Sequence, residues 1–338
     1  MNAKSILFRS LPWLAAASLV AGRAWAADPQ VVLKLAEVHP QGYPTELADE
    51  EFAKLVAERT QGRIKVEVYP GAQLGDEKAA IEQVQIGAIA FTRVSSAPMA
   101  QFSKQLGVFS LPYIFDSKDH MWAFLNGAGG KKMLEDLTAS GFVGLAYFDG
   151  GARSFYSTKP MTKVEDLKGL KFRVIQNEWS VKMVNAFGAN ATPMAYGQVF
   201  SAIQTGVIEG AENNAPSYLT SSHYQVAKNY LLDGHQRIPE VLVASKTVFD
   251  GLSREDQAVI RKAAADSVAK QRQLWDAFEG EALAKVKAAG STVVAVKDLA
   301  PYQRAVEPVI KEASTQFGDS LKAISAARPK FGGGVLDE

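Results

Sequence analysis

The sequence reads GGARSFY at residues 150–156 and KGLKFRV at residues 168–174. In each run a glycine, which lets the backbone turn tightly or approach a ligand closely, is followed by a short strand that carries an arginine. A guanidinium is always charged, and its planar fork of donors fits a carboxylate two bonds at a time. Two interpretations of Arg153 and Arg173 follow: each is a surface strand residue paired with a nearby acid, or each holds a carboxylate in a cleft.

The composition is that of a globular protein long enough for two domains. The chain has 338 residues, of which 47% are hydrophobic and 22% are charged. Its 37 basic and 36 acidic residues give a formal net charge of +1, without the basic excess of a nucleic-acid binder, so no nucleic-acid partner is expected. The chain contains no cysteine, which excludes thiol catalysis, disulfides and cysteine metal sites.

The first 26 residues have the pattern of a cleavable signal peptide. Lys4 and Arg9 provide a positive start, residues 11–20 are apolar, and AWA at residues 24–26 offers the small residues that a signal peptidase reads. The apolar run is too short to span a bilayer, and no later stretch approaches about 18 consecutive apolar residues. We therefore predict cleavage after Ala26 and a soluble, exported mature protein.

The part of the chain before the arginine runs alternates between strand and helix patterns. Strands are expected at residues 31–38, 64–69 and 88–94, and helices at residues 45–60 and 76–86. This order predicts an α/β fold with parallel strands and helices on the sheet faces.

Ligands of such folds bind in the loops that follow the carboxyl ends of the strands. His39, Glu77 and Arg93 lie in loops of this kind and are candidate ligand contacts. Each also has a structural interpretation. His39 would cap a turn, Glu77 would face the positive end of a helix dipole, and Arg93 would neutralise Glu77.

A second α/β unit follows the arginine runs. Its elements are expected to be helices at residues 178–187 and 196–205 and strands at residues 191–194, 208–213 and 239–245. Residues 254–289 then read as one helix, long enough to brace two lobes. His120, His223 and His235 have no partner at metal-ligand spacing, so no metal site is expected.

Five motifs in register resemble the periplasmic solute-binding proteins of tripartite ATP-independent periplasmic (TRAP) transporters, the DctP-type family. They are YPGAQLG at residues 69–75, GARSFY at 151–156, LKGLKFRV at 167–174, TPMAY at 192–196 and QTGVIEGAEN at 204–213. The resemblance implies a two-lobe periplasmic binding protein fold with hinge strands and a long lobe-spanning helix. Its expected parts are a signal peptide at 1–26, lobe I at 27–151 plus about 239–278, lobe II at 152–238 plus about 279–330, and a flexible tail at 331–338.

The resemblance also implies how the site residues are used. The family's arginine in the KGLKFR motif pairs with the ligand carboxylate, which corresponds to Arg173. By the same correspondence Arg153 is a second contact and Asn213 a polar one. Tyr196 lies where the family often has an aromatic residue, and Gln176 where it has a polar one.

The nature of the acid stays open between two classes. HPQGYPT at residues 39–45, together with Glu77, Arg93 and ENN at residues 212–214, is similar to family members that bind hexuronates such as glucuronate and galacturonate. A sugar acid needs several polar partners, because a hydroxyl buried without one costs about 1–3 kcal/mol. A C4-dicarboxylate would instead require a second cation, and Arg93 is available for that role.

A third possibility is an exported enzyme that acts on the same acids. Such chemistry needs a general base tuned near neutral pH and often a metal held by clustered carboxylates, and the sequence shows neither pattern. No catalytic residue and no cofactor are therefore expected. The expected partners are the organic acid and, through the resemblance, the membrane permease subunits of a TRAP transporter. A periplasmic monomer is expected.

Overall fold

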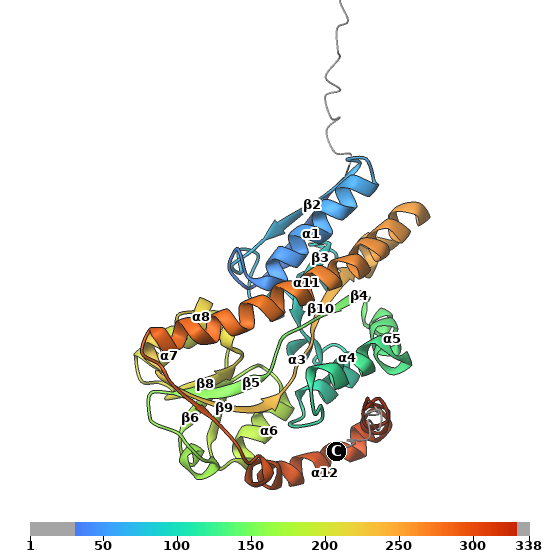
Figure 1. The fold of residues 1–338 in the computed structure, drawn as a ribbon. Coiled ribbons are helices and arrows are strands. Elements are labelled where there is room, and N and C mark those ends of the chain that lie inside the picture. Colours follow the sequence, from blue (N-terminus) through green and yellow to red (C-terminus); the bar gives the residue numbers. More distant parts are fainter. Residues whose placement is uncertain (1–30, 330–338) are drawn as a thin grey trace, which may run out of the picture.

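The protein folds into two β-sheets that are covered by helices and joined by one long helix (Figure 1). The structure, a computed structural model, describes residues 31–329. The expected signal peptide, its cleavage site after Ala26 and the expected tail at 331–338 lie outside this range. Within it, no helix combines the length and the apolar character that a membrane crossing requires.

The first sheet has five strands in the order β2-β1-β3-β10-β4. The strands are β1 (Val31–Glu37), β2 (Ile64–Tyr69), β3 (Phe91–Ser95), β4 (Phe142–Phe148) and β10 (Glu240–Ser245). β1 pairs in parallel with β2 and β3, as the alternating pattern predicted, whereas β10 returns from the second unit and runs antiparallel to β3 and β4.

The second sheet has six strands in the order β11-β9-β5-β8-β6-β7. The strands are β5 (Arg153–Ser157), β6 (Lys171–Val174), β7 (Asn190–Pro193), β8 (Gly210–Asn213), β9 (Asn229–Gln236) and β11 (Thr292–Ala295). β9 was not predicted from the sequence. Its run NYLLDGHQ contains an Asp-Gly pair that suggests a turn, yet β9 is paired on both sides, with β5 and with β11.

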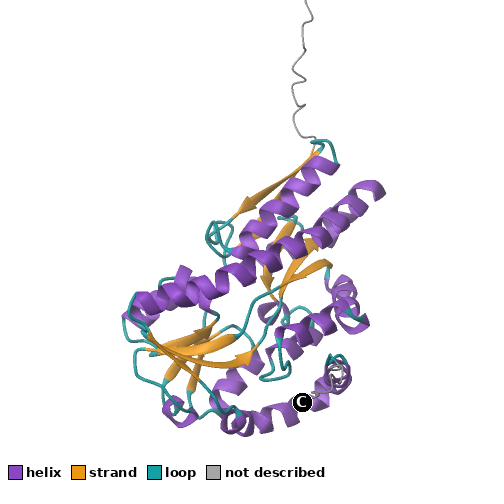
Figure 2. Cartoon of the chain, viewed as in Figure 1, coloured by secondary structure: helices purple, strands orange, loops and turns teal. Residues whose placement is uncertain are grey.

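Helices cover both faces of these sheets, as Figure 2 shows in purple. The α-helices are α1 (Pro44–Arg59), α2 (Glu77–Gln85), α3 (Ser96–Met99), α4 (Lys118–Asn126), α5 (Ala128–Asp136), α6 (Glu178–Ala186), α7 (Val199–Gln204), α8 (Ala215–Thr220), α9 (His223–Val226), α10 (Lys246–Asp250), α11 (Arg254–Ala288) and α12 (Ala300–Ala326). The 3-10 helices are η1 (Lys104–Ser110), η2 (Leu137–Ser140), η3 (Val164–Leu167) and η4 (Tyr196–Gln198).

The long helix α11 spans both sheets, as predicted. At about 1.5 Å per residue its 35 residues extend over roughly 52 Å. Ile260 and Ala264 pack into the core of the first sheet, while Ala282 and Val286 pack into the core of the second. The figure shows it running across the molecule beside α1 and α8 (Figure 1).

Two short segments carry the chain between the sheets, residues 149–152 and 237–239. The first is tied to α11, because the Gln271 side chain both accepts from the Asp149 N–H at 2.8 Å and donates to the Asp149 carbonyl at 2.9 Å. The second glycine of this segment, Gly151, has φ +66° and lies against Trp275. These contacts with α11 hold the backbone of residues 149–152 in place where the chain passes between the two halves.

Helix α12 contacts both halves of the molecule. Tyr302 and Val306 pack with the second sheet's core, whereas Val309 and Phe317 pack with residues that cover the first sheet. The expected boundaries of the lobes, which assigned residues 279–330 to lobe II, stay a prediction.

A buried array of charges lies under the middle of the second sheet. Glu212 of β8 pairs with Arg153 of β5, and His235 of β9 lies 2.9 Å from Asp233 and 3.6 Å from Glu212. Burial lowers the pKa of His235, but Asp233 and Glu212 outweigh it and raise the value to about 9. For Glu212 burial raises the pKa, but Arg153 and His235 lower it to about 2. Glu212, Arg153 and His235 are therefore charged at neutral pH.

We predict that Gly210→Ala destabilises the protein by at least 2 kcal/mol, because the added Cβ would meet the Tyr156 carbonyl oxygen at 2.1 Å and Phe172 at 2.8 Å. Gly197→Ala is the matched control, since nothing lies within 4 Å of its added Cβ. Urea unfolding of the two variants measures the difference. Equal stabilities would contradict the close approach of β8 to β5.

We also predict that stability falls as the pH rises through 9. A histidine whose pKa is about 9 when folded and 6.5 when unfolded contributes fully below pH 6.5 and loses its contribution as the pH passes 9. The contribution is on the order of 3 kcal/mol. Unfolding free energies at several pH values, compared between the parent and His235→Gln, test this. Identical pH slopes for the two proteins would refute it.

Candidate functional site

A small, partly open cavity of about 20 Å³ lies between the two sheets. From the first half it is lined by Val38, His39, Glu77, Ser95 and Glu240. From the second half it is lined by Arg153, Arg173, Ile175, Tyr196, Asn213, Asn214 and Ser217. This volume is far below the roughly 300–1,000 Å³ of pockets that hold small molecules, so binding a sugar acid requires the cavity walls to move apart.

The cavity lies where strands of both sheets end. His39 follows β1, Ser95 ends β3, Ile175 follows β6 and Asn213 ends β8. The carboxyl ends of neighbouring parallel strands meet at one edge of a sheet, so residues far apart in sequence face one space. Six of the eight sequence-predicted site residues line this cavity: His39, Glu77, Arg153, Arg173, Tyr196 and Asn213.

Arg173, in β6, is a buried cation that lacks an acidic partner. It is 2% exposed, and its Nε donates to the Met194 carbonyl at 3.0 Å. Within residues 31–329, no aspartate or glutamate oxygen lies within the 4 Å of an ion pair with Arg173. Burial lowers the pKa of Arg173, an effect that Glu212 opposes and Arg153 reinforces. A buried charge is costly unless it is paired, so this guanidinium is a strong site for an anion.

Arg153, in β5, is already neutralised. Its Nε donates to Glu212 Oε2 at 2.5 Å, and its Nη2 donates to Glu212 Oε1 at 3.0 Å and to the Glu212 carbonyl at 2.9 Å. Nη1 donates to Asn213 Oδ1 at 3.0 Å. Of its five N–H groups these bonds engage four, which leaves one for the cavity. The charge of Arg153 is balanced locally, unlike that of Arg173.

Arg93, in β3, does not line the cavity, contrary to its selection as a ligand contact. It is fully buried behind the cavity wall, where it pairs with Glu37 of β1 and donates to Glu240 Oε2 at 2.6 Å. Its Nη1 also lies 3.8 Å from Glu77. The structural interpretation of the sequence paired Arg93 with Glu77, but it did not reveal Glu37 and Glu240, which come from strands on either side of β3.

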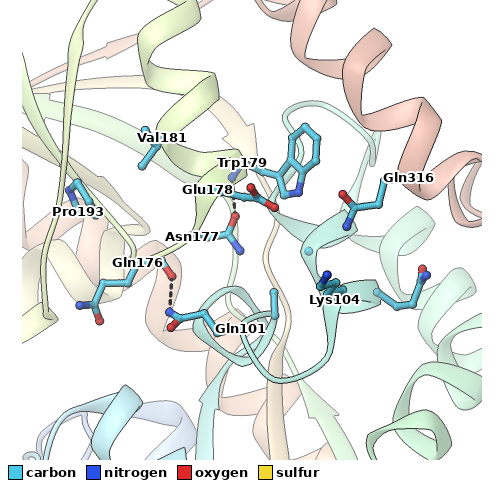
Figure 3. A pocket seen from close by; sticks show the side chains of 12 residues that line it. Gln101, Lys104, Gln176, Asn177, Glu178, Trp179, Val181, Pro193 and Gln316 are labelled. Atoms are coloured by element: carbon cyan, nitrogen blue, oxygen red, sulfur yellow. Dashed lines mark hydrogen bonds between the residues drawn. The ribbon is translucent and has the colours of Figure 1, made fainter. Parts of the chain in front are cut away.

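Gln176 also lies outside the cavity, and Figure 3 shows it bonded to Gln101. Its carbonyl accepts a 3.2 Å bond from Gln101 of the other half, and its side chain lines a separate groove together with Trp179. β6 ends at Val174. Of the two residues that follow it, Ile175 faces the cavity and Gln176 faces away from it. Trp179 is buried, and its ring centroid lies 5.6 Å from that of Phe317.

Aromatic rings close the cavity on one side. His39 stacks on Tyr43 with ring centroids 3.9 Å apart, and Tyr196 lies at 5.5 Å from His39. Tyr43 also bonds across the two halves, with its hydroxyl 2.9 Å from Ser217 Oγ. Burial and Arg93 lower the pKa of His39, although Glu37 opposes them, so the ring is neutral at pH 7.

Asn213 presents an amide to the cavity. Its Oδ1 accepts from Arg153 and from the Asn214 N–H at 2.9 Å, which fixes the amide orientation. Its Nδ2 donates to no residue in the described part of the chain. An acceptor in the cavity would satisfy it.

Sequence reasoning missed Glu240, Ser95 and Ser217 as wall residues. Glu240 opens β10, which returns to the first sheet after the entire second unit, so no local pattern places it beside β3. Asn214 caps α8 by accepting from the Ser217 N–H at 2.7 Å, and this Asn-x-x-Ser pattern, which contains Pro216 in the first turn, was the one readable signal. In residues 31–329, no group of three or more potential metal ligands occurs.

The chain is similar to known proteins over most of its length. The model of the bacterial extracellular solute-binding proteins of family 7 matches residues 35–316. A solute-binding protein of Chromohalobacter salexigens is 41% identical over 273 residues, which cover 80% of this chain and 81% of that protein.

Solved structures agree with this. A TRAP periplasmic solute-binding protein of Xanthobacter autotrophicus Py2, with bound β-D-galacturonate, is 45% identical with a TM-score of 0.85, covering 88% of this chain and 100% of its own. One from Pseudomonas putida F1, with bound D-glucuronate, is 40% identical with a TM-score of 0.86, covering 88% of this chain and 98% of its own. This chain therefore belongs to the bacterial extracellular solute-binding proteins of family 7, the DctP family of TRAP transporters.

Proposed function

We propose that this protein binds a hexuronate, glucuronate or galacturonate, in the cavity between its halves and delivers it to the membrane permease of a TRAP transporter. The observation that carries the proposal is Arg173, a buried cation on the cavity wall that no acid of the described chain neutralises. Similar structures that hold β-D-galacturonate or D-glucuronate support the ligand class. Export with cleavage after Ala26, action in the periplasm as a monomer and the permease partnership belong to the same proposal.

The polar wall suits a ligand with several hydroxyls. Arg173 takes the carboxylate, with the remaining Arg153 donor beside it. Asn213 Nδ2, the neutral His39 ring and the Tyr196 hydroxyl then meet sugar hydroxyls. Because an unpaired buried hydroxyl costs about 1–3 kcal/mol, such a set of partners favours a sugar acid over an unsubstituted one. The alternative ligand class, a C4-dicarboxylate anchored at Arg93, is weakened because Arg93 already contacts Glu37 and Glu240.

The binding step is capture and enclosure without chemistry. Ligand enters while the halves are apart, and closure around the crossing segments then excludes water from the ion pair, which strengthens it. Bonds between the halves hold the closed form: Tyr43 to Ser217, Asn177 Nδ2 to the Ala97 carbonyl at 2.9 Å, and Gln101 to Gln176. We propose no catalytic residue and no cofactor for this function.

A thermal-shift screen of the mature protein from Ala27 tests the ligand class. Hexuronates, aldonates, C4-dicarboxylates, keto acids and sialic acid are compared. At 100-fold excess over its dissociation constant, a ligand should stabilise the protein by about 2.7 kcal/mol, a shift of a few degrees. A hexuronate hit supports the proposal. A hit confined to C4-dicarboxylates would refute it.

We predict that Arg173→Met weakens hexuronate binding by 100-fold or more without destabilising the ligand-free protein. The variant removes the partner of the ligand carboxylate, but it also removes a buried charge that no acid balances. Arg173→Lys should bind at least 10-fold more weakly than the parent, because an ammonium cannot reproduce the planar fork. Calorimetric titration and urea unfolding measure both effects. Parent-like binding by Arg173→Lys would overturn the bidentate contact.

We predict that Arg153→Met, unlike Arg173→Met, destabilises the ligand-free protein. It leaves Glu212 buried and facing no guanidinium, at a cost of about 3–5 kcal/mol. Arg153→Met/Glu212→Leu should recover much of this loss, because both charges are then removed. Unfolding curves of the single and double variants measure the coupling. A single variant as stable as the parent would show that the Arg153–Glu212 pair is not structural.

A further inference from the structure

Carboxylates outnumber cations at the end of the cavity that the first sheet forms. The Arg93 guanidinium contacts three of them: Glu37, Glu240 at 2.6 Å and Glu77 at 3.8 Å. The His39 Nδ1 lies between Arg93 Nη2, at 2.7 Å, and Glu37 Oε1, at 3.1 Å. Burial and Arg93 lower the pKa of the ring, so His39 adds no positive charge at neutral pH. The three carboxylates therefore share the single positive charge of Arg93.

Two of these acids face the cavity with unused acceptor capacity. Glu77 Oε1 accepts from the Ser95 N–H at 2.8 Å, and Glu240 Oε2 accepts from Arg93. The other oxygen of each side chain, Glu77 Oε2 and Glu240 Oε1, accepts no hydrogen bond from residues 31–329. Both side chains are nearly buried, 13% and 9% exposed, so a ligand group placed there exchanges water for these oxygens.

The local field already resists further negative charge. Burial raises the pKa of Glu240 to about 7; Arg93 opposes this, and Glu77 and Glu37 add to it. A hydroxyl brought to this wall donates to the two oxygens. A carboxylate brought there would face two like charges in a water-poor space, which is strongly unfavourable.

We propose that Glu77 and Glu240 determine the ligand class, accepting hydroxyls at the end of the ligand remote from Arg173 and rejecting a second carboxylate there. This rests on the proposed function, in which Arg173 binds the first carboxylate. The site then takes sugar acids with a single carboxylate and excludes aldarates, the diacids that differ from hexuronates by a carboxylate at C1. Rejection by a repulsive group is a common source of specificity.

The test compares each hexuronate with its own aldarate: D-galacturonate with galactarate, and D-glucuronate with D-glucarate. Calorimetric titrations are run near pH 8, where Glu240, with a pKa of about 7, is ionised. The parent should bind the better hexuronate at least 30-fold more tightly than its aldarate, and a smaller ratio overturns the proposal. Glu240→Gln and Glu77→Gln should each reduce this ratio at least 10-fold, because an amide donates to a carboxylate.

Controls separate charge from shape and from misfolding. Glu312→Gln, an exposed carboxylate on α12, should leave the ratio unchanged. Retained hexuronate binding by Glu240→Gln shows that the variant folds, and Arg93 keeps its pair with Glu37 in it. If both glutamate variants, singly and combined, discriminate as strongly as the parent, ligand shape and not charge excludes aldarates, and the inference is wrong.

The same titrations also distinguish a failure of this inference from a failure of the proposed function. If the hexuronates fail to bind, or bind equally well to Arg173→Met, the proposed function fails. If hexuronates bind through Arg173 and their aldarates bind as well, only the role of Glu77 and Glu240 fails.

Discussion

The unbalanced charge of Arg173 is the constraint on which the rest of the site depends. Three arginines are buried around the cavity, and their chemistry is the same, but their surroundings differ. Arg93 and Arg153 each meet a carboxylate of a neighbouring strand, whereas Arg173 meets only a carbonyl in the described chain. Transferring an ion from water to a protein interior costs several kcal/mol, so the closed form without an anion is penalised at this one position.

The two balanced arginines give the cavity its walls. The pair of Arg153 with Glu212 joins β5 to β8, and the pair of Arg93 with Glu37 joins β3 to β1. Paired buried charges add little net stability, but their geometry is demanding, since each guanidinium is held by several bonds at once. Asn213 and Glu240 are fixed by these same arginines. The pairs therefore orient the groups that face the ligand.

Much of the fold could be predicted, because parallel strands and their helices have strong local periodicity. Elements such as β1, α1 and α11 follow from hydrophobic spacing alone. β9 did not, since its Asp-Gly pair signals a turn and only pairing on both sides makes it a strand. The site residues also differ in how far they could be predicted. Arg173 and Asn213 belong to local motifs that the sequence shows directly. Glu240 reaches the cavity only because β10 pairs with β3, which is far away in sequence, and Gln176 points away from the cavity although its neighbour Ile175 lines it.

Closure depends on the ligand because the bonds between the halves do no more than offset the cost of burying Arg173. Those bonds are neutral hydrogen bonds, such as Tyr43 to Ser217 and Asn177 to Ala97, each worth about 0.5–1.5 kcal/mol net. A few such bonds together contribute about as much free energy as an unpaired guanidinium loses when it leaves water, which is several kcal/mol. The stabilisation by the bonds and the desolvation cost of Arg173 therefore nearly cancel. A carboxylate that pairs with Arg173 removes the penalty and leaves the bonds between the halves unopposed. The same residue therefore both recognises the ligand and couples its arrival to enclosure.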